Sequence, residues 1–209
     1  MITPNDTMAD TIPDTLRTGA ESLLSPARRR LVALATSYVG CHDTTDRDRY
    51  LALICGPGDQ SAQAHHDLES ASGCALTVRG LWRLAGLMHP ILTAPYVTGH
   101  AMQDLEAIAR ETGAWVEPKP GAPLPMPGDA VILASPTGGH AYTVLAVHVG
   151  ERTELETVDG GQRDAAGRQW VARMTHMWTT EGGGIVDRAY SARRVHGFVN
   201  VDKLRWGET

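Results

Sequence analysis

The hydrophobic pattern of the chain changes near Trp115, and this change limits what the chain can fold into. Before it, apolar residues recur at the spacing of α-helices. The helices that this spacing predicts span about 26–39, 46–54, 74–87 and 99–112. The segment 119–127 then holds four prolines, and this density of proline excludes helix.

Runs of β-type residues follow the prolines. They span 130–134, 142–149, 154–158, 169–176 and 196–201. The glycine-rich stretches 159–161 and 181–184 are typical of turns or loops between strands. Helices followed by a meandering antiparallel sheet predict an α+β fold in one domain.

Length and charge restrict the class of protein. A chain of 209 residues can build one full core but is short for two ordinary domains. We predict a flexible polar leader over 1–24 and a single domain over 25–209. The formal net charge of −5 gives no bias toward nucleic acid. No apolar run approaches the roughly 18 residues of a membrane helix, and we find no signal peptide.

The three cysteines, Cys41, Cys55 and Cys74, follow no CxxC spacing, which argues against a disulfide framework or a zinc site. The stretch His65-His66-Asp67 lacks a third ligand at a useful spacing, so we interpret it as a solvated polar loop. We therefore expect no metal and no cofactor.

Cys74 is the candidate nucleophile. Ser72 is a good N-cap residue, and the apolar face of a helix follows Cys74, so the thiol is predicted in the first helical turn. Unpaired backbone N–H groups and the positive end of the helix dipole there favour the thiolate. The thiolate is the form that attacks carbonyl carbon, and this placement suits covalent catalysis.

A base and an orienting group follow further along the chain. His140 opens the predicted strand at 142–149, and a hairpin with the next strand would bring Asp159 back beside it. A carboxylate there would fix the imidazole tautomer and favour imidazolium. Gln162 is the alternative orienter. The backbone N–H of Cys74 would bind the oxyanion, assisted by the Ser72 side chain.

Structural interpretations compete with these assignments. Cys74 could be a small buried hydrophobe, and Asp159 a turn residue before two glycines. Cys41 follows a predicted helix, where the dipole disfavours a thiolate, and Cys55 precedes Gly-Pro-Gly as a packing residue. His148 lies at the far end of its predicted strand, and we interpret it as an ordinary residue.

The order of these motifs resembles the NlpC/P60 and CHAP superfamily of papain-like cysteine amidases and endopeptidases, with the CHAP-like amidases of phage and prophage most similar. In that superfamily a cysteine opens a helix, as at 73–78, and a Pro-Gly-Asp leads a strand, as at 127–131. A Gly-His then precedes a strand, as at 139–140, and an acidic or amide residue follows, as at 158–162. The likeness extends over about residues 27–203.

The resemblance implies a papain-like fold in which N-terminal helices pack on a small antiparallel β-sheet. It implies that Cys74 is the nucleophile, His140 the base and Asp159 the third member of a triad. The implied substrate is a peptide or amide bond of bacterial peptidoglycan stem peptides, cut through a thioacyl-enzyme without a cofactor.

The missing leader leads to an expectation about delivery. A free-standing lysin or secreted effector of this kind would be made in the cytoplasm and exported through a holin or a secretion system, and an effector would have a cognate inhibitor or immunity protein. Two alternatives stay open: a non-catalytic binding or assembly protein on the same fold, and an intracellular papain-like amidase acting on a non-wall substrate.

Overall fold

The computed structural model describes residues 24–55, 73–93, 100–119, 121–135, 138–189 and 193–207. Helices precede strands, as the spacing predicted. The helices are α2 (Pro26–Tyr38), α3 (Arg47–Ile54), α5 (Gly73–Leu84), α6 (Pro90–Thr93) and α7 (Ala101–Glu111). The strands are β1 (Trp115–Val116), β2 (Ala130–Ser135), β3 (Gly138–Val149), β4 (Thr153–Arg163), β5 (Gln169–Glu181), β6 (Gly184–Asp187) and β7 (Arg193–Val199), and a short 3-10 helix, η1 (Val201–Lys203), follows.

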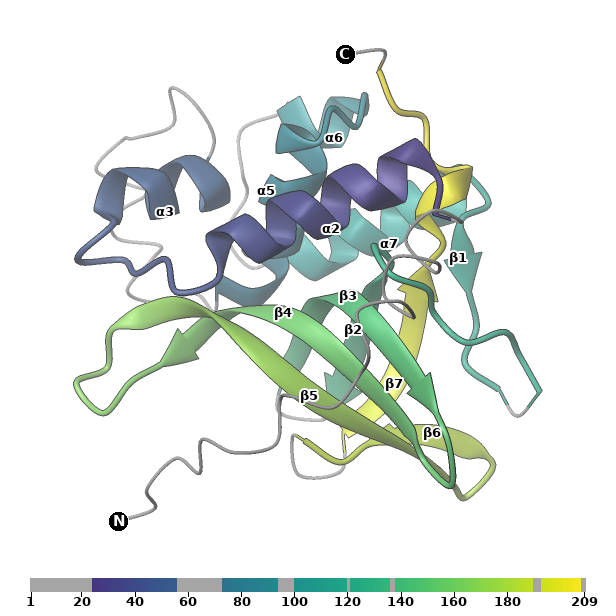
Figure 1. The fold of residues 1–209 in the computed structure, drawn as a ribbon. Helices are drawn as coiled ribbons and strands as arrows, with labels where there is room; N and C mark the ends of the chain where they lie inside the picture. The colour runs from purple at the N-terminus through teal and green to yellow at the C-terminus, as the bar shows by residue number, and fades with distance from the viewer. Residues whose placement is uncertain are drawn as a thin grey trace.

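Strands β2 to β7 form a closed antiparallel barrel (Figure 1). Neighbouring strands pair in the order β7-β2-β3-β4-β5-β6, and β6 pairs with β7 through Val186 opposite Arg194 and Asp187 opposite Arg193. This last pairing closes the ring. Strand β1 pairs with the other end of β7 and lies outside the ring. The helices gather on one side of the barrel, and α5 packs against β3 and β4.

The prediction of a papain-like α+β fold is wrong. The chain forms a closed six-stranded antiparallel barrel with few helices, so the fold is mostly β rather than helices on a small open sheet. The difference arises after His176, where we expected the strand to end. Strand β5 runs on to Glu181, and Gly182 and Gly183, with φ of 56° and 79°, turn the chain back into β6. The glycines interpreted as a loop therefore make the hairpin that supplies the closing strand.

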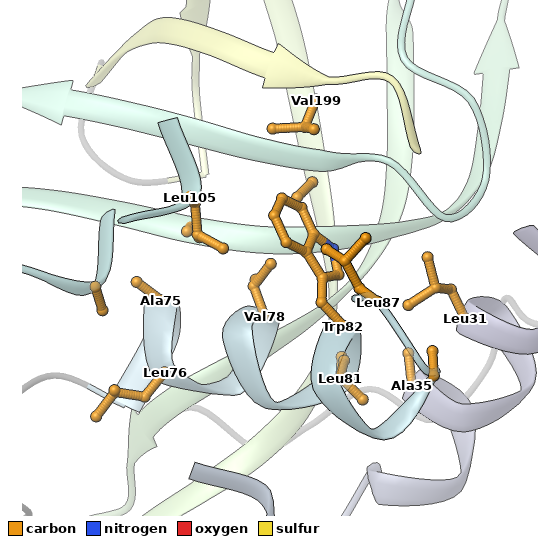
Figure 2. Packing of buried hydrophobic residues seen from close by; sticks show 14 of the residues in the cluster. Leu31, Ala35, Ala75, Leu76, Val78, Leu81, Trp82, Leu87, Leu105 and Val199 are labelled. Atoms are coloured by element: carbon orange, nitrogen blue, oxygen red, sulfur yellow. The ribbon is translucent and has the colours of Figure 1, made fainter. Parts of the chain in front are cut away.

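Two hydrophobic clusters lie on opposite faces of the barrel wall. The larger cluster packs the helices against the outer face, and Figure 2 shows Trp82 and Val78 of α5 turned toward the strands near Val199. The smaller cluster contains Val131, Leu133, Tyr142, Val144, Leu155, Trp178, Val195 and Phe198. Its residues alternate along the strands with residues of the outer cluster, so they fill the barrel interior.

A buried arginine fastens the first helix to the barrel. Ser25 caps α2 by accepting the backbone N–H of Arg28, and Pro26 opens the helix as predicted. The guanidinium of Arg28 contacts Asp129 at 2.8 Å and Asp202 at 2.6 Å. The Pro-Gly-Asp motif at 127–129 therefore contributes to the joint between α2, β2 and the C-terminal segment. Among the helices of the described residues, none has the length and apolar character that crossing a membrane requires.

Candidate active site

Cys74 lies in the first turn of α5, where the sequence placed it. The helix begins at Gly73, and its residues 73–82 are all buried. Cys74 itself is 3% exposed. The thiol therefore lies at the positive end of a helix whose whole first half is enclosed by protein.

The two glycines after Asp159 allow the helix to approach the strand. Predicted as part of a turn, Gly160 and Gly161 instead lie inside β4, next to a register shift in its pairing with β5. A Cβ atom on Gly160 would lie 1.9 Å from Thr77 Oγ1, and one on Gly161 would lie 2.5 Å from the backbone nitrogen of Gly73. Side chains at these positions would push the start of α5 away from β4.

His140 lies on β3 and faces Asp159 of β4. Its Nε2–H donates to Asp159 Oδ2 at 2.6 Å, and both side chains are buried. Burial lowers the pKa of His140, but the hydrogen bonds to Asp159 and to Cys74 outweigh it and raise the pKa to about 9. Burial raises the pKa of Asp159, and the hydrogen bonds from His140 and His176 reverse the effect and hold it well below the usual range.

The structure thus brings the three predicted catalytic residues together. The hydrogen bond between the Cys74 and His140 side chains and the one between His140 and Asp159 place the imidazole between a thiol and a carboxylate. Because Nε2 is taken by Asp159, Nδ1 is the ring nitrogen left for the thiol. This is the arrangement that nucleophilic catalysis by cysteine requires.

The remaining predicted site residues have different outcomes. Of the two candidate orienters, Asp159 contacts the imidazole, whereas Gln162 lies past the register shift, opposite Trp170 of β5. Ser72 and the stretch 65–67 lie outside the described residues.

Two further candidates, Cys41 and His148, have different surroundings. Cys41 is buried between α2 and α3, and burial, followed by the charge of Asp46, raises the pKa of its thiol. His148 is 40% exposed and pairs with Glu156 at 3.3 Å, in agreement with its interpretation as an ordinary strand residue.

A second histidine–aspartate pair, which the sequence analysis missed, lies behind Asp159. His176 of β5 donates to Asp159 Oδ2 from Nε2 at 3.1 Å and to Asp187 Oδ2 from Nδ1 at 2.7 Å. Both side chains are completely buried. The hydroxyl of Tyr142 donates to the same oxygen of Asp187 at 2.8 Å and accepts the indole N–H of Trp178 at 3.0 Å.

A signal for His176 was present in the sequence. Ala172, Met174, His176 and Trp178 occupy every second position, so a strand that continued past residue 176 would turn His176 and Trp178 to one face. We expected the strand to end at His176, and that choice hid the alternation. Asp187 had no comparable signal, because it follows a glycine stretch interpreted as a loop.

Within the described residues, no group of three or more histidine, cysteine, aspartate or glutamate side chains is arranged to hold a metal ion. Comparison of the chain with protein-family models, with curated proteins and with solved structures found no match in any of the three. The site must therefore be interpreted from its own geometry.

Proposed function

We propose that this protein is a cysteine hydrolase that cleaves an amide or peptide bond. The observation that carries the proposal is the placement of His140 between the Cys74 thiol, at the start of a helix, and the Asp159 carboxylate. Nucleophile, base and orienter come from α5, β3 and β4, three elements that pack directly on one another.

The chemistry follows from this order of groups. The Cys74 thiolate attacks the carbonyl carbon, the tetrahedral intermediate collapses to a thioacyl-enzyme, and the His140 imidazolium gives its proton to the leaving amine. His140, now neutral, takes a proton from water, and the resulting hydroxide attacks the thioester and releases the carboxylic acid. Asp159 keeps the imidazole in one tautomer and orientation throughout.

Electrostatics favour the ion-pair state of the resting site. With a pKa of about 9, His140 is an imidazolium at neutral pH, while Asp159 is ionised. An imidazolium beside the sulfur stabilises the thiolate, and the first-turn N–H groups add to this. The pair is buried, so little solvent screens the attraction.

The backbone N–H of Cys74 is the proposed oxyanion donor. A Cβ atom at position 161 would lie 2.9 Å from this nitrogen, so a side chain there would crowd the N–H group. Gly161 also has a φ of +68°, which any side chain would strain.

The substrate class rests on the sequence resemblance. We propose peptidoglycan stem peptides as the substrate, because the order of the motifs at 73–78, 139–140 and 158–162 is similar to that of amidases and endopeptidases of the cell wall. A protein acting on this substrate would have to reach the wall, and export through a holin or a secretion system remains the proposed route.

One observation favours a second candidate function. Cys74 is 3% exposed and His140 is 5% exposed, so a substrate reaches the sulfur only when neighbouring groups move aside. In a non-catalytic binding or assembly protein, Cys74 would be a packed hydrophobic residue that never becomes accessible. The rate of chemical modification of Cys74 separates the two functions.

The test is alkylation of the full-length protein by iodoacetamide from pH 5 to 10, with each modified cysteine mapped by mass spectrometry. If the protein is a hydrolase, Cys74 should be labelled faster than Cys41 and Cys55. Its labelling should also stay fast at pH values well below roughly 8.5, the pKa of an ordinary thiol. Labelling of Cys74 no faster than Cys41 at pH 7 would overturn the hydrolase and support the binding protein.

Digestion of purified peptidoglycan tests the substrate. The wild type should release new amino groups, whereas Cys74→Ser and His140→Gln should release none, and Cys41→Ser is the matched control that keeps activity. Reactive Cys74 without cleavage of peptidoglycan would contradict the substrate class while leaving the cysteine chemistry in place.

A further inference from the structure

The side-chain hydrogen-bond network of the site extends beyond Asp159. They continue through the barrel interior as His176, Asp187 and Tyr142, with contacts of 3.1, 2.7 and 2.8 Å. We call these three residues together with Asp159 the interior relay. They come from β4, β5, β6 and β3, and the contact between Tyr142 of β3 and Asp187 of β6 joins strands that are not neighbours in the sheet.

The burial of the relay carries a desolvation cost. Its four side chains are fully buried, and they lie in the interior that also holds the apolar cluster of Val131, Leu133 and Phe198. Apolar residues of similar volume could fill this space, and buried ionic groups in place of them are frequently neutral or unfavourable for stability. A role beyond packing is therefore expected.

The geometry determines the protonation state of His176. Each of its ring nitrogens faces a carboxylate oxygen, of Asp159 on one side and of Asp187 on the other. Two ionised carboxylates can only accept hydrogen bonds, so in that state both ring nitrogens carry a proton and the ring is an imidazolium. Burial lowers the pKa of His176, but the hydrogen bonds to Asp159 and Asp187 prevail and raise it.

We propose that His176, held doubly protonated between Asp159 and Asp187, is a positioning residue that acts on His140 through Asp159. Asp159 Oδ2 accepts from both histidines, and its Oδ1 accepts from the hydroxyl of Thr157. The carboxylate is held from three sides and cannot rotate away from His140. The effect on catalysis rests on the proposed function, whereas the protonation of His176 does not.

His176 also adjusts the charge that His140 meets. Its positive charge lies across one shared oxygen from the His140 ring, and like charges disfavour one another. The titratable groups that face His176 are Asp159 from β4, Asp187 from β6 and Tyr142 from β3, whose ring centroid is 4.0 Å away. Replacing His176 by a neutral residue should therefore raise the pKa of His140.

The first test uses the wild-type protein and needs no activity. Side-chain ¹H–¹⁵N NMR at pH 7.5, with His176→Gln for assignment, should show protons on both ring nitrogens of His176. Only one protonated nitrogen would overturn the proposal. Because this measurement is made on the wild type, it tests the protonation of His176 even if the variant unfolds. In that case the resonances are assigned through their contacts with Tyr142.

The second test is the pH profile of Cys74 alkylation by iodoacetamide. In a thiolate–imidazolium pair the profile has an upper step where His140 loses its proton. In His176→Gln this step should move up by about one pH unit, the usual effect of a nearby charge. The matched control is His148→Gln, the same substitution at a histidine that is 40% exposed at the other end of the His140 strand, and it should leave the step in place.

The outcomes separate the two proposals. A wild type with two steps and a His176→Gln variant whose upper step is unmoved would overturn the positioning role and leave the hydrolase standing. A wild type with only the single step of an ordinary thiol would overturn the hydrolase, and with it any part of His176 in catalysis.

Discussion

The outer face of the barrel, which the helices cover, is packed with apolar side chains, whereas the interior of the same barrel carries two histidines and two aspartates. Trp82, Leu81 and Val78 of α5 are fully buried in the outer cluster. His176 and Asp187 are equally buried on the inner side. The outer cluster and the interior relay thus have the same exposure and opposite chemistry, while apolar residues such as Val131 and Leu133 fill the rest of the interior.

This contrast indicates that the two faces have different roles. Burial of apolar surface stabilises a fold without demanding one arrangement, whereas a buried polar group is tolerated only when its hydrogen bonds are made. We infer that the outer cluster supplies stability and that the interior relay sets the geometry of the site. Changes on the two faces should therefore have separable effects.

The largest expected effect is on the outer face. Trp82→Ala removes a fully buried indole and should lower the free energy of unfolding by about 3–5 kcal/mol. Cys74 lies more than two turns away at the start of α5, so its alkylation profile in the still-folded protein at low temperature should be unchanged. Urea unfolding and iodoacetamide labelling measure the two quantities.

The matched control is Met88→Ala, since Met88 is an apolar side chain that is 72% exposed and should cost little when truncated. A Trp82→Ala protein that keeps its stability, or one that loses the low-pH reactivity of Cys74 while folded, would contradict the division between the faces.

The buried histidines of the inner face should instead make the stability of the protein depend on pH. The pKa of His140 is raised from 6.5 to about 9. A raised pKa adds stability that is complete below 6.5 and is lost as the pH climbs through 9. The contribution of His140 to the free energy of unfolding should therefore fall by up to about 3 kcal/mol over this window, and His176, whose pKa is also raised, adds in the same direction. A folded-state thiolate at Cys74 has the opposite sign, because it adds stability as the pH rises toward the roughly 8.5 of an unfolded thiol, so the net fall is smaller and is concentrated near pH 9.

Urea unfolding at pH 6, 7.5 and 9 measures this slope. His140→Gln should flatten it, and His148→Gln, which removes a histidine 40% exposed on the same strand, should leave it as in the wild type. An equal slope in all three proteins would show that the buried histidine does not carry the effect.

The sequence predicted what depends on local signals. The cap at Ser25, the helix starting at Cys74 and the strands at 142–149 and 154–158 are recognisable from neighbours a few residues apart, and the hairpin between those strands brought Asp159 to His140 as expected. The candidate triad could be assembled from these signals because each one lies within a single element or a single hairpin.

The closure of the barrel could not be predicted in the same way. It depends on the pairing of Asp187 with Arg193 and of Val186 with Arg194. The hydrophobic periodicity of the sequence does not predict which strands pair. Without β6 in the expected fold, no reason existed to place Asp187 near His176. The close approach of Gly160 to Thr77 was missed for a related reason, because two glycines in a row are more common in turns than inside strands.

A substitution at the contact between α5 and β4 should have an intermediate effect on stability. A Cβ atom in Gly160→Ala would lie 1.9 Å from Thr77 Oγ1 and 2.8 Å from the carbonyl oxygen of Gly73. Relief of this overlap requires α5 to shift, so we expect a loss of about 1–3 kcal/mol together with slower Cys74 alkylation. Gly150→Ala, whose added Cβ would have its nearest contact at 3.9 Å, is the control. Unchanged labelling in Gly160→Ala would separate the helix–strand contact from the reactivity of the thiol.

The smallest effect is expected at the far end of the interior relay. Tyr142→Phe keeps the buried ring beside His176 but removes a hydroxyl that donates to Asp187 and accepts from Trp178. Leaving two buried partners one hydrogen bond short should cost about 1–2 kcal/mol in urea unfolding. Tyr38→Phe, the same change on α2 outside the barrel, should cost less. Because Asp187 retains its bond to His176, the upper step of the Cys74 alkylation profile should stay in place in Tyr142→Phe. A shift of that step would mean that the whole relay, rather than its half nearest Asp159, sets the charge on His140.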